Sequence, residues 1–597
     1  MFTQLRAHIR KLSIVNAVCL AFLILVVSAC GGSTTTTPTP TPGIQYTVLD
    51  LGIPQSALNA PITGALPANQ VIHVGVTFKT NQAAIDQWNK ATGKNHVQKG
   101  SADASTIANQ LGITDSEYQQ IKSFFGVKDA TLTLNKLHTY MAVDAKVSTV
   151  NQVFHTKLVQ HQLNGRTYYT PDPSMPPQVP TPIASQIVSV TGLDNYSTLN
   201  TGISASAMQP VSALTQRRPA DCSPASSTYN TSQIAAVYGY NQFWQQGFKG
   251  QGMTANLVEI DTYSPLDINN FAQCVGFNTN NLHLSTVDGL PPPPPSSEPP
   301  IESTLDIDML MGLAPQSTIN DYQTGLANDQ GVNDALQQII NDNAKNVNSA
   351  SVVSISLGGA ENGETSAGVN AINSSLEQLV QVEHMTVFVS TGDCAAYGAG
   401  TYGQLNVQFP ASDPYAVAVG GTEWSAGSNG TINESAWSDG SASHSSCNNS
   451  WGSGGGLSTL FKRPSWEQGN GINNQYSNGD RQEPDISALA SQIAVYVLGG
   501  WQSVGGTSAA TPIWAAGLML VNQALIHNDN GTYYYSPGLF YQAISTASSS
   551  SQPYNDVTQG SNLFYPTTAG WDYATGWGSP NLTNFYNILL HDAQSGG

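Results

Sequence analysis

Six short apolar segments alternate with helical stretches over residues 220–597, and this alternation constrains the fold more than any other feature of the 597-residue chain. Apolar strands separated by helices are typical of a mainly parallel sheet covered on both faces. A region of this length can form one large domain. We therefore expect an α/β domain with a mainly parallel central sheet flanked by helices. The expected strands are Ala255–Val258, Thr318–Asn320, Val352–Ile355, Thr386–Val389, Ala416–Val419 and Ile493–Leu498.

A serine stands at a strand–turn–helix junction near the end of this region. Residues 505–512 read Gly-Gly-Thr-Ser-Ala-Ala-Thr-Pro, between the apolar segment Ile493–Leu498 and the Ala-rich stretch Ile513–Ile526. Glycines allow another backbone to approach closely, and a helix N-terminus offers N–H groups to a developing anion. Ser508 is therefore a candidate nucleophile. The alternative is an ordinary turn that precedes a helix.

Two carboxyl groups offer a base for this serine. Glu302 and Asp306 are four residues apart in a predicted helix, so their side chains share one face. Because adjacent like charges raise one pKa of a pair, Asp306 can hold a proton and orient Glu302. The alternative is a solvated acidic face, but the apolar run Met309–Leu313 favours a buried helix. No histidine after residue 200 precedes a Gly-rich helix start.

A third acidic residue follows the apolar strand that begins at Val387. Asp393 stands at the carboxyl end of that strand, in Thr-Gly-Asp-Cys, where ligands bind in open α/β sheets. A carboxyl group can stabilise an oxyanion only when it is protonated and donates a hydrogen bond. This arrangement favours acidic pH. The alternative is a turn or capping role for Asp393.

Together these motifs resemble the sedolisin family of serine-carboxyl peptidases, which includes the kumamolisins. Further blocks in the family's order are residues 409–422, 454–458 and 484–488. The resemblance implies a subtilisin-like fold, Ser508 as nucleophile, Glu302 as base, Asp306 as its orienting partner and Asp393 in the oxyanion hole. Glu259 is a further candidate for the family's outer hydrogen-bond network. One departure is Leu357, which replaces an aromatic residue of that network.

The resemblance also implies one structural calcium ion near the C-terminus. The side-chain ligands would be those of Asp556 and Asp572, and the carbonyl ligands those of Val557, Thr568 and Gly570. Carboxylates and carbonyls form the hard-oxygen set that Ca²⁺ prefers. Without the resemblance, two aspartates in Gly-rich loops would be read as turn residues.

The N-terminus resembles a bacterial lipoprotein export signal. Three basic residues precede an apolar run that ends in Val-Ser-Ala-Cys30-Gly-Gly. We expect a signal peptide over residues 1–29, lipid on Cys30 that attaches the protein to the membrane, and a Ser/Thr/Pro-rich tether over residues 30–46. The alternative is a plain signal peptide that leaves the protein secreted and extracellular.

Residues 47–195 combine predicted strands and helices in an order typical of an α+β fold. The region resembles the sedolisin activation domain, which implies an inhibitory prodomain, and the alternative is an independent binding module. Residues 196–219 read as a polar linker that contains Arg217-Arg218, a candidate processing zone, and residues 220–597 as the peptidase domain.

Four cysteines remain after export: Cys222, Cys274, Cys394 and Cys447. An even number in an exported protein suggests two disulfides. Four cysteines allow three pairings, and proximity in sequence favours Cys222–Cys274 and Cys394–Cys447.

Charge and mechanism both point to acidic conditions. The chain carries 20 Lys+Arg against 39 Asp+Glu, a net charge of −19, which argues against a nucleic-acid partner. We expect a monomeric zymogen, active in acid on polypeptide substrates. The rivals are a catalytically silent peptide-binding surface lipoprotein and a neutral, histidine-dependent hydrolase of the subtilisin type.

Overall fold

The computed structural model describes residues 44–595 with internal gaps, and residues 46–597 form one unit apart from residues 1–45. The predicted signal peptide, Cys30, nearly all of the tether and Arg217-Arg218 lie outside the described residues. The described ranges are 44–93, 96–100, 102–125, 129–201, 209–210, 222–224, 227–291, 301–398, 403–427, 431–439 and 451–595.

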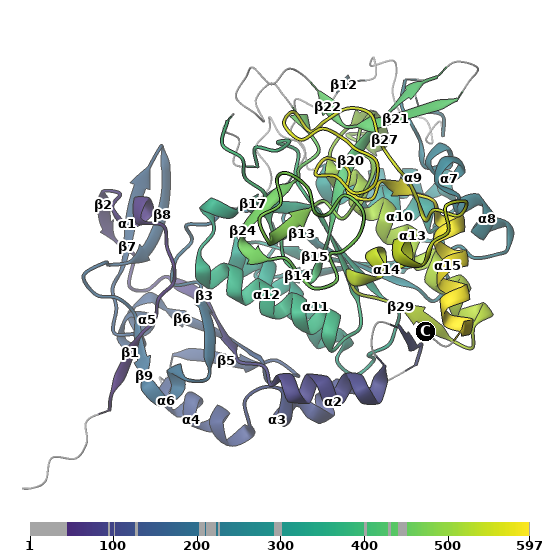
Figure 1. The fold of residues 1–597 in the computed structure, drawn as a ribbon. Helices are drawn as coiled ribbons and strands as arrows, with labels where there is room; N and C mark the ends of the chain where they lie inside the picture. The colour runs from purple at the N-terminus through teal and green to yellow at the C-terminus, as the bar shows by residue number, and fades with distance from the viewer. Residues whose placement is uncertain are drawn as a thin grey trace, which may run out of the picture. The chain divides into compact units, whose positions relative to one another are not determined.

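An eight-stranded sheet forms the centre of the C-terminal region (Figure 1). Its order is β14–β15–β13–β16–β18–β20–β21, and β26 pairs with β20. Every pair is parallel except β20 with β21. The expected mainly parallel sheet is confirmed. Its strands are β13 (Thr254–Glu259), β14 (Leu282–Val287), β15 (Thr318–Thr324), β16 (Val352–Ile355), β18 (Thr386–Ser390), β20 (Ala416–Ala426), β21 (Ile432–Ala436) and β26 (Ile486–Leu489).

Four long helices pack on this sheet in two pairs. One pair is α11 (Asp329–Asn343) with α12 (Ser366–Gln381), and the other is α10 (Glu302–Leu313) with α13 (Thr507–Asn528). Every residue of α10 is buried. Among the described helices, only α13 has the length and hydropathy of a membrane span, and 89% of that window is buried inside the protein, as expected of a core helix.

The segment Ile493–Leu498 differs from expectation. Its strand, β27 (Ile493–Val497), pairs antiparallel with β28 (Gly500–Val504) in a sheet separate from the central one. An apolar run predicts a buried strand but not its partner or direction, so the assignment to the parallel sheet was wrong. The strand that leads into α13 is therefore β28.

The N-terminal region has the expected α+β character. Its antiparallel sheet has the order β10–β3–β6–β5, and a second sheet has the order β2–β7–β8. The strands of the first sheet are β3 (Val71–Phe78), β5 (Ala130–Leu134), β6 (Tyr140–Lys146) and β10 (Ile187–Thr191). The second sheet contains β2 (Ile62–Ala65), β7 (Leu158–Leu163) and β8 (Arg166–Pro171).

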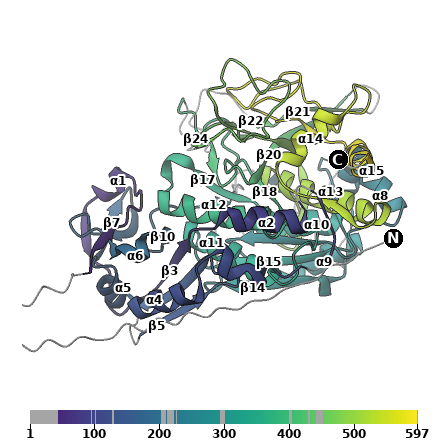
Figure 2. The ribbon, with the colours of Figure 1, turned by 60° about the horizontal axis from the view of Figure 1, so that its bottom comes forward.

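Two elements of the N-terminal region lie against the C-terminal region. Helix α2 (Gln82–Thr92) lies along it in Figure 2, and Trp88 Nε1 donates to the carbonyl of Val382 at 3.0 Å. Strand β4 (His96–Gln98) pairs antiparallel with β29 (Thr532–Tyr534). The two regions therefore share backbone and side-chain hydrogen bonds.

One of the two expected disulfides is confirmed. Cys222 and Cys274 are bonded, with 5.3 Å between their Cα atoms. The expected Cys394–Cys447 pairing involves Cys447, which lies outside the described residues, so it stays a prediction.

Candidate active site

Ser508 is the second residue of helix α13 and is fully buried. The preceding Gly506 has φ of +151° and marks the sharp entry into the helix. A Cβ atom on Gly506 would lie 2.8 Å from Oδ2 of Asp393, so glycine leaves room for that carboxyl. The Ser508 hydroxyl donates a long hydrogen bond of 3.4 Å to the carbonyl of Ser356.

Helix α10 carries Glu302 at its first position and Asp306 one turn later, as the sequence predicts. Glu302 is 2% exposed, and neither of its carboxylate oxygens has a hydrogen-bond partner of ordinary geometry among the described residues. Asp306 accepts a hydrogen bond from the Ser356 hydroxyl at 2.7 Å. Glu302 is thus free to take a proton, while Asp306 is held in place.

The pKa of both carboxyls is raised, mainly because burial disfavours the charged form. For Glu302 the negative charge of Asp306 raises the pKa further, while the Ser508 hydroxyl lowers it. For Asp306 the Ser356 hydroxyl and Glu259, which can share a proton with it, lower the pKa against burial and the charge of Asp261.

Asp393 follows β18 and faces the start of α13. Its Oδ1 accepts hydrogen bonds from the Thr507 amide at 2.8 Å and the Thr507 hydroxyl at 2.9 Å. Burial raises the pKa of Asp393 to about 7, although both Thr507 bonds oppose this. Asp393 is therefore protonated in acid and can donate a hydrogen bond there.

The structure brings these residues together from three separate elements. Glu302 and Asp306 come from α10, Asp393 from the end of β18, and Ser508 from α13. The hydrogen bonds through Ser356 and Thr507 link them. The arrangement places a serine hydroxyl, two carboxyls one helical turn apart and a third carboxyl in one buried region.

Glu259 and Leu357, the two residues considered for the outer hydrogen-bond network, are both buried. Glu259 ends strand β13, is fully buried and lies close enough to Asp306 for each to affect the other's pKa. Leu357 begins strand β17 (Leu357–Ala360) and is buried. The sequence analysis missed Asp261, Asp321 and Ser356, although Asp261 stands directly after a parallel strand, where site residues gather.

The expected calcium ligands lie on two neighbouring loops. The Gly570 amide donates to Oδ2 of Asp556 at 3.0 Å, and the Thr568 amide donates to Oδ2 of Asp572 at 2.9 Å. Asp572 also accepts hydrogen bonds from Ala574 and Thr575, and burial raises its pKa to about 7.

The donor set fits a hard cation. No described residue donates a hydrogen bond to the carbonyl oxygens of Val557, Thr568 or Gly570. No lysine, arginine or histidine forms an ion pair with either aspartate within the described ranges. Two carboxylates and three free carbonyls without a basic partner form the kind of oxygen set that Ca²⁺ binds.

The chain is similar in sequence to proteins of known family. Residues 62–196 match the family described as Pro-kumamolisin, activation domain. The chain is 26% identical to kumamolisin of Bacillus sp. (strain MN-32), over 90% of this chain and 95% of that protein. It is also 26% identical to sedolisin of Pseudomonas sp. (strain 101), over 87% of each.

A solved structure extends the likeness to the fold. The structure of Pseudomonas sedolisin, a serine-carboxyl proteinase complexed with two molecules of pseudo-iodotyrostatin, aligns with a TM-score of 0.51 and 26% identity. The alignment covers 61% of this chain and 99% of that one. The likeness therefore spans nearly all of that proteinase.

Proposed function

Because the chain belongs to the sedolisin family of serine-carboxyl peptidases and carries a pro-kumamolisin-type activation domain, we propose that it is an exported, acid-acting peptidase made as a self-processing zymogen. The observation that carries the proposal is the meeting of Glu302, Asp306, Asp393 and Ser508 in one buried place. A silent peptide-binding lipoprotein has no need of all four.

In the proposed reaction Ser508 Oγ attacks the peptide carbonyl while Glu302 takes its proton. The C–N bond then breaks, and the leaving amine receives that proton from Glu302, which leaves an acyl group on Ser508. Water, deprotonated by Glu302, then attacks the ester; the bond between Ser508 Oγ and the acyl carbon breaks, and Glu302 returns the proton to Ser508 Oγ. Asp306, held by Ser356, keeps Glu302 in position and shares its proton.

Asp393 acts in its protonated form. The carboxyl hydrogen is donated to the tetrahedral oxyanion, and Thr507 fixes the carboxyl through two hydrogen bonds. Because the pKa of Asp393 is about 7, this donor is present in acid and is lost as the pH rises above that value. Glu302 must be ionised, which sets the acid side of the activity profile.

Two short strands of the linker support self-processing. Strand β11 (Asn200–Thr201) pairs antiparallel with β17, with Thr201 opposite Leu357, the neighbour of Ser356. Strand β12 (Gln209–Pro210) pairs antiparallel with β28, which leads into the helix of Ser508. A peptidase substrate binds by adding such a strand to the edge of a cleft. We propose that the first cut falls between Thr201 and Gln209.

The N-terminal region would act as the intramolecular inhibitor. Besides the linker strands, β4 adds to β29 and α2 contacts the C-terminal region through Trp88 and Asn89. These contacts hold the linker beside the site until it is cut. The proposed divisions are prodomain 47–195, linker 196–219 and peptidase domain 220–597.

We further propose that one calcium ion is held by Asp556 and Asp572 with the carbonyls of Val557, Thr568 and Gly570. When bound, the ion would neutralise the two carboxylates and join the two loops. It takes no part in the chemistry at Ser508.

The remaining proposals concern location. A signal peptide over residues 1–29, lipid on Cys30 and the tether over residues 30–46 would place a monomeric enzyme at the outer surface of a bacterial membrane. The sequence pattern at Cys30 supports this.

A gel time course of the precursor without residues 1–30 tests the proposal. At pH values between about 4, near the intrinsic pKa of glutamate, and about 7, the pKa of Asp393, wild type should shorten, and mass spectrometry should find a new N-terminus between residues 202 and 209. Ser508→Ala and Glu302→Gln should both stay intact. A folded wild-type precursor that stays intact in acid would favour the silent binder. Cleavage that persists in Ser508→Ala would refute the assigned nucleophile.

A further inference from the structure

Asp261 lies at the N-terminus of the helix that carries Glu302. Its Oδ2 accepts a hydrogen bond from the Glu302 amide at 3.1 Å, and its Oδ1 accepts one from the Ser303 amide at 3.0 Å. The Ser303 hydroxyl also donates to Oδ1. Both carboxylate oxygens are therefore used at this helix start.

The first amides of a helix have no partner within the helix and need one from elsewhere. Helix α10 has no side-chain cap of its own, because the residue before it is Ile301. The cap comes from Asp261, which follows β13 and is separated from Glu302 by 41 positions. Asp261 thus fixes the backbone of Glu302 itself.

Asp261 also contributes charge to the acidic groups around it. Its negative charge raises the pKa of Glu259 on β13, of Glu302 and Asp306 on α10, and of Asp321 on β15. Asp393 also raises the pKa of Glu302. No lysine, arginine or histidine forms an ion pair with any of these residues in the described part of the chain.

Hydrogen bonds favour the charged form of Asp261. Burial raises the pKa of Asp261 above its ordinary value, and the Ser303 hydroxyl and the amides of Ser303, Glu302 and Ile301 reduce this rise without cancelling it. The helix N-terminus favours a negative charge at the same place. Within this acidic group, Asp261 is thus the one carboxylate that several N–H donors stabilise.

We propose that Asp261 is a positioning residue for Glu302: it caps the catalytic helix from outside and, when ionised, supplies a negative charge beside the general base. The inference rests on the proposed role of Glu302 as base. It assigns a function to a residue that touches neither Ser508 nor the reacting carbonyl.

The charge has a definite consequence for pH dependence. Removal of the Asp261 charge lowers the pKa of Glu302, so the base ionises at lower pH and the acid limb of kcat moves toward acid. The alkaline limb is set by Asp393, whose pKa shift has Asp439, not Asp261, as its charged cause. That limb should stay where it is.

Asp261→Asn in the processed enzyme tests the proposal, with labelled casein as substrate. Asparagine keeps one acceptor for Ser303 but cannot accept from the Glu302 amide, so kcat should fall about tenfold or more at the optimum with little change in KM. The acid limb should move by roughly half a pH unit or more, since this charge lies close to the base. Asp261→Ser, an uncharged cap, should move the same limb if the asparagine variant does not fold.

Asp308→Asn is the matched control. Asp308 lies on the same helix, is fully buried and accepts the Tyr496 amide at 2.9 Å, but no member of the acidic group is a cause of its pKa shift. Its acid limb should equal that of wild type. An unmoved acid limb in both Asp261 variants would overturn the inference. Activity that survives in Glu302→Gln would instead refute the proposed function, so the two failures are distinguishable.

Discussion

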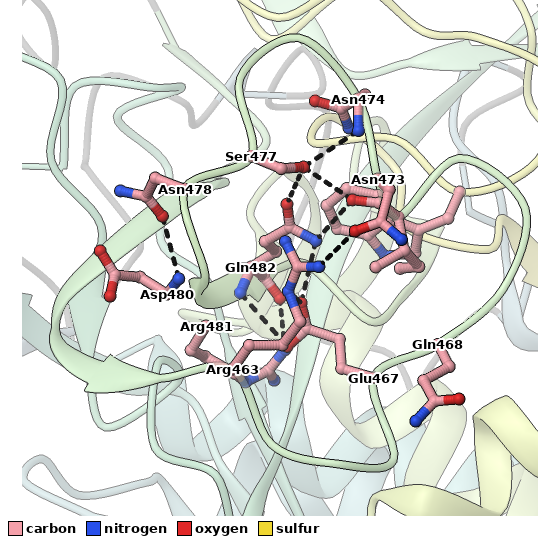
Figure 3. A network of polar contacts seen from close by, with 12 residues as sticks. Arg463, Glu467, Gln468, Asn473, Asn474, Ser477, Asn478, Asp480, Arg481 and Gln482 are labelled. Atoms are coloured by element: carbon pink, nitrogen blue, oxygen red, sulfur yellow. Dashed lines mark hydrogen bonds and ion pairs between the residues drawn. The ribbon is translucent and has the colours of Figure 1, made fainter.

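Two buried groups of carboxylates in the C-terminal region are neutralised in different ways. Figure 3 shows Arg481 close to Glu467. The fully buried guanidinium of Arg481 donates to both oxygens of Asp485, at 2.8 and 2.6 Å. It also lies 3.4 Å from Glu467 and stacks 5.1 Å from the ring of Trp466. Arg481 thus balances the charge of Asp485, while burial still raises the pKa of Glu467 to about 7.

The group around Glu302 has no such cation among the described residues. Burial raises the pKa of Glu259, Glu302, Asp306 and Asp321, so protons take the place of the arginine. A proton can be transferred during a reaction and an arginine cannot. The group around Glu302 is therefore suited to the proton transfers that we propose, whereas the group around Arg481 is suited to stabilising the fold.

The largest effect should appear when one proton-transfer group is removed. Ser508→Ala or Glu302→Gln should lower kcat/KM by a factor on the order of 10⁴ or more, because nucleophile and base act as one unit. Their melting temperatures should stay within a few degrees of wild type, since neither change leaves a charge unpaired. Enzyme assays and calorimetry on the same preparations measure both.

The double variant provides the internal check. Because the two residues act together, Ser508→Ala/Glu302→Gln should be no less active than the worse single variant. Additive losses would show that the two side chains act independently and would contradict a shared proton transfer.

The stability of the protein should fall as the pH rises, because buried carboxyls near Ser508 then lose their protons. Burial raises the pKa of Asp321 to about 8 and that of Asp393 to about 7 in the folded protein, so the folded state binds more protons than the unfolded state between pH ~4 and ~8. The free energy of unfolding therefore decreases with pH across this window, by on the order of 5 kcal/mol or more.

Urea unfolding of the Ser508→Ala protein at several pH values measures this slope without self-digestion. Asp321→Asn should flatten the slope, because one of the responsible carboxyls is gone. A free energy of unfolding that rises from acid to neutral pH would contradict the claim that these buried carboxyls are protonated in the folded protein.

Removal of the cation from the Arg481 group should lower the stability of the protein and leave kcat/KM nearly unchanged. Arg481→Met leaves Asp485 and Glu467 buried without their cation, which typically costs about 3–5 kcal/mol. Lys462→Met is the control, because Lys462 pairs with Asp480 at the surface and is 86% exposed. An exposed pair contributes less than about 1 kcal/mol. Equal losses of stability in the two variants would show that buried Arg481 contributes no more than exposed Lys462.

Motifs that lie at strand ends and helix starts could be predicted from sequence. The strands β13, β15, β16, β18 and β20 were expected from apolar runs, and Ser508 and Glu302 stand at helix starts, as their local sequences indicate. Such positions depend on a few neighbouring residues and on periodicity.

Features that depend on approach between distant segments could not be predicted. The cap on Glu302 comes from Asp261, and β4 pairs with a strand more than four hundred positions away. The Asn135 side chain accepts hydrogen bonds from the amides of Thr139 and Tyr140 and closes the turn between β5 and β6. Local pattern does not specify tertiary hydrogen bonds.

The smallest expected effect concerns a third way to neutralise buried carboxylates, with a metal ion. Asp572 is buried and has a pKa of about 7 without a basic partner in the described ranges. If calcium binds Asp556 and Asp572, a hundredfold excess over its dissociation constant stabilises the fold by about 2.7 kcal/mol. Melting of the Ser508→Ala protein with calcium and with a chelator measures this. Asp556→Asn should melt at the chelator temperature under both conditions. A calcium response that persists in this variant would place the ion elsewhere.

Because the ion replaces protons on these carboxylates, the calcium-dependent rise in melting temperature should also grow from pH ~5 to ~7.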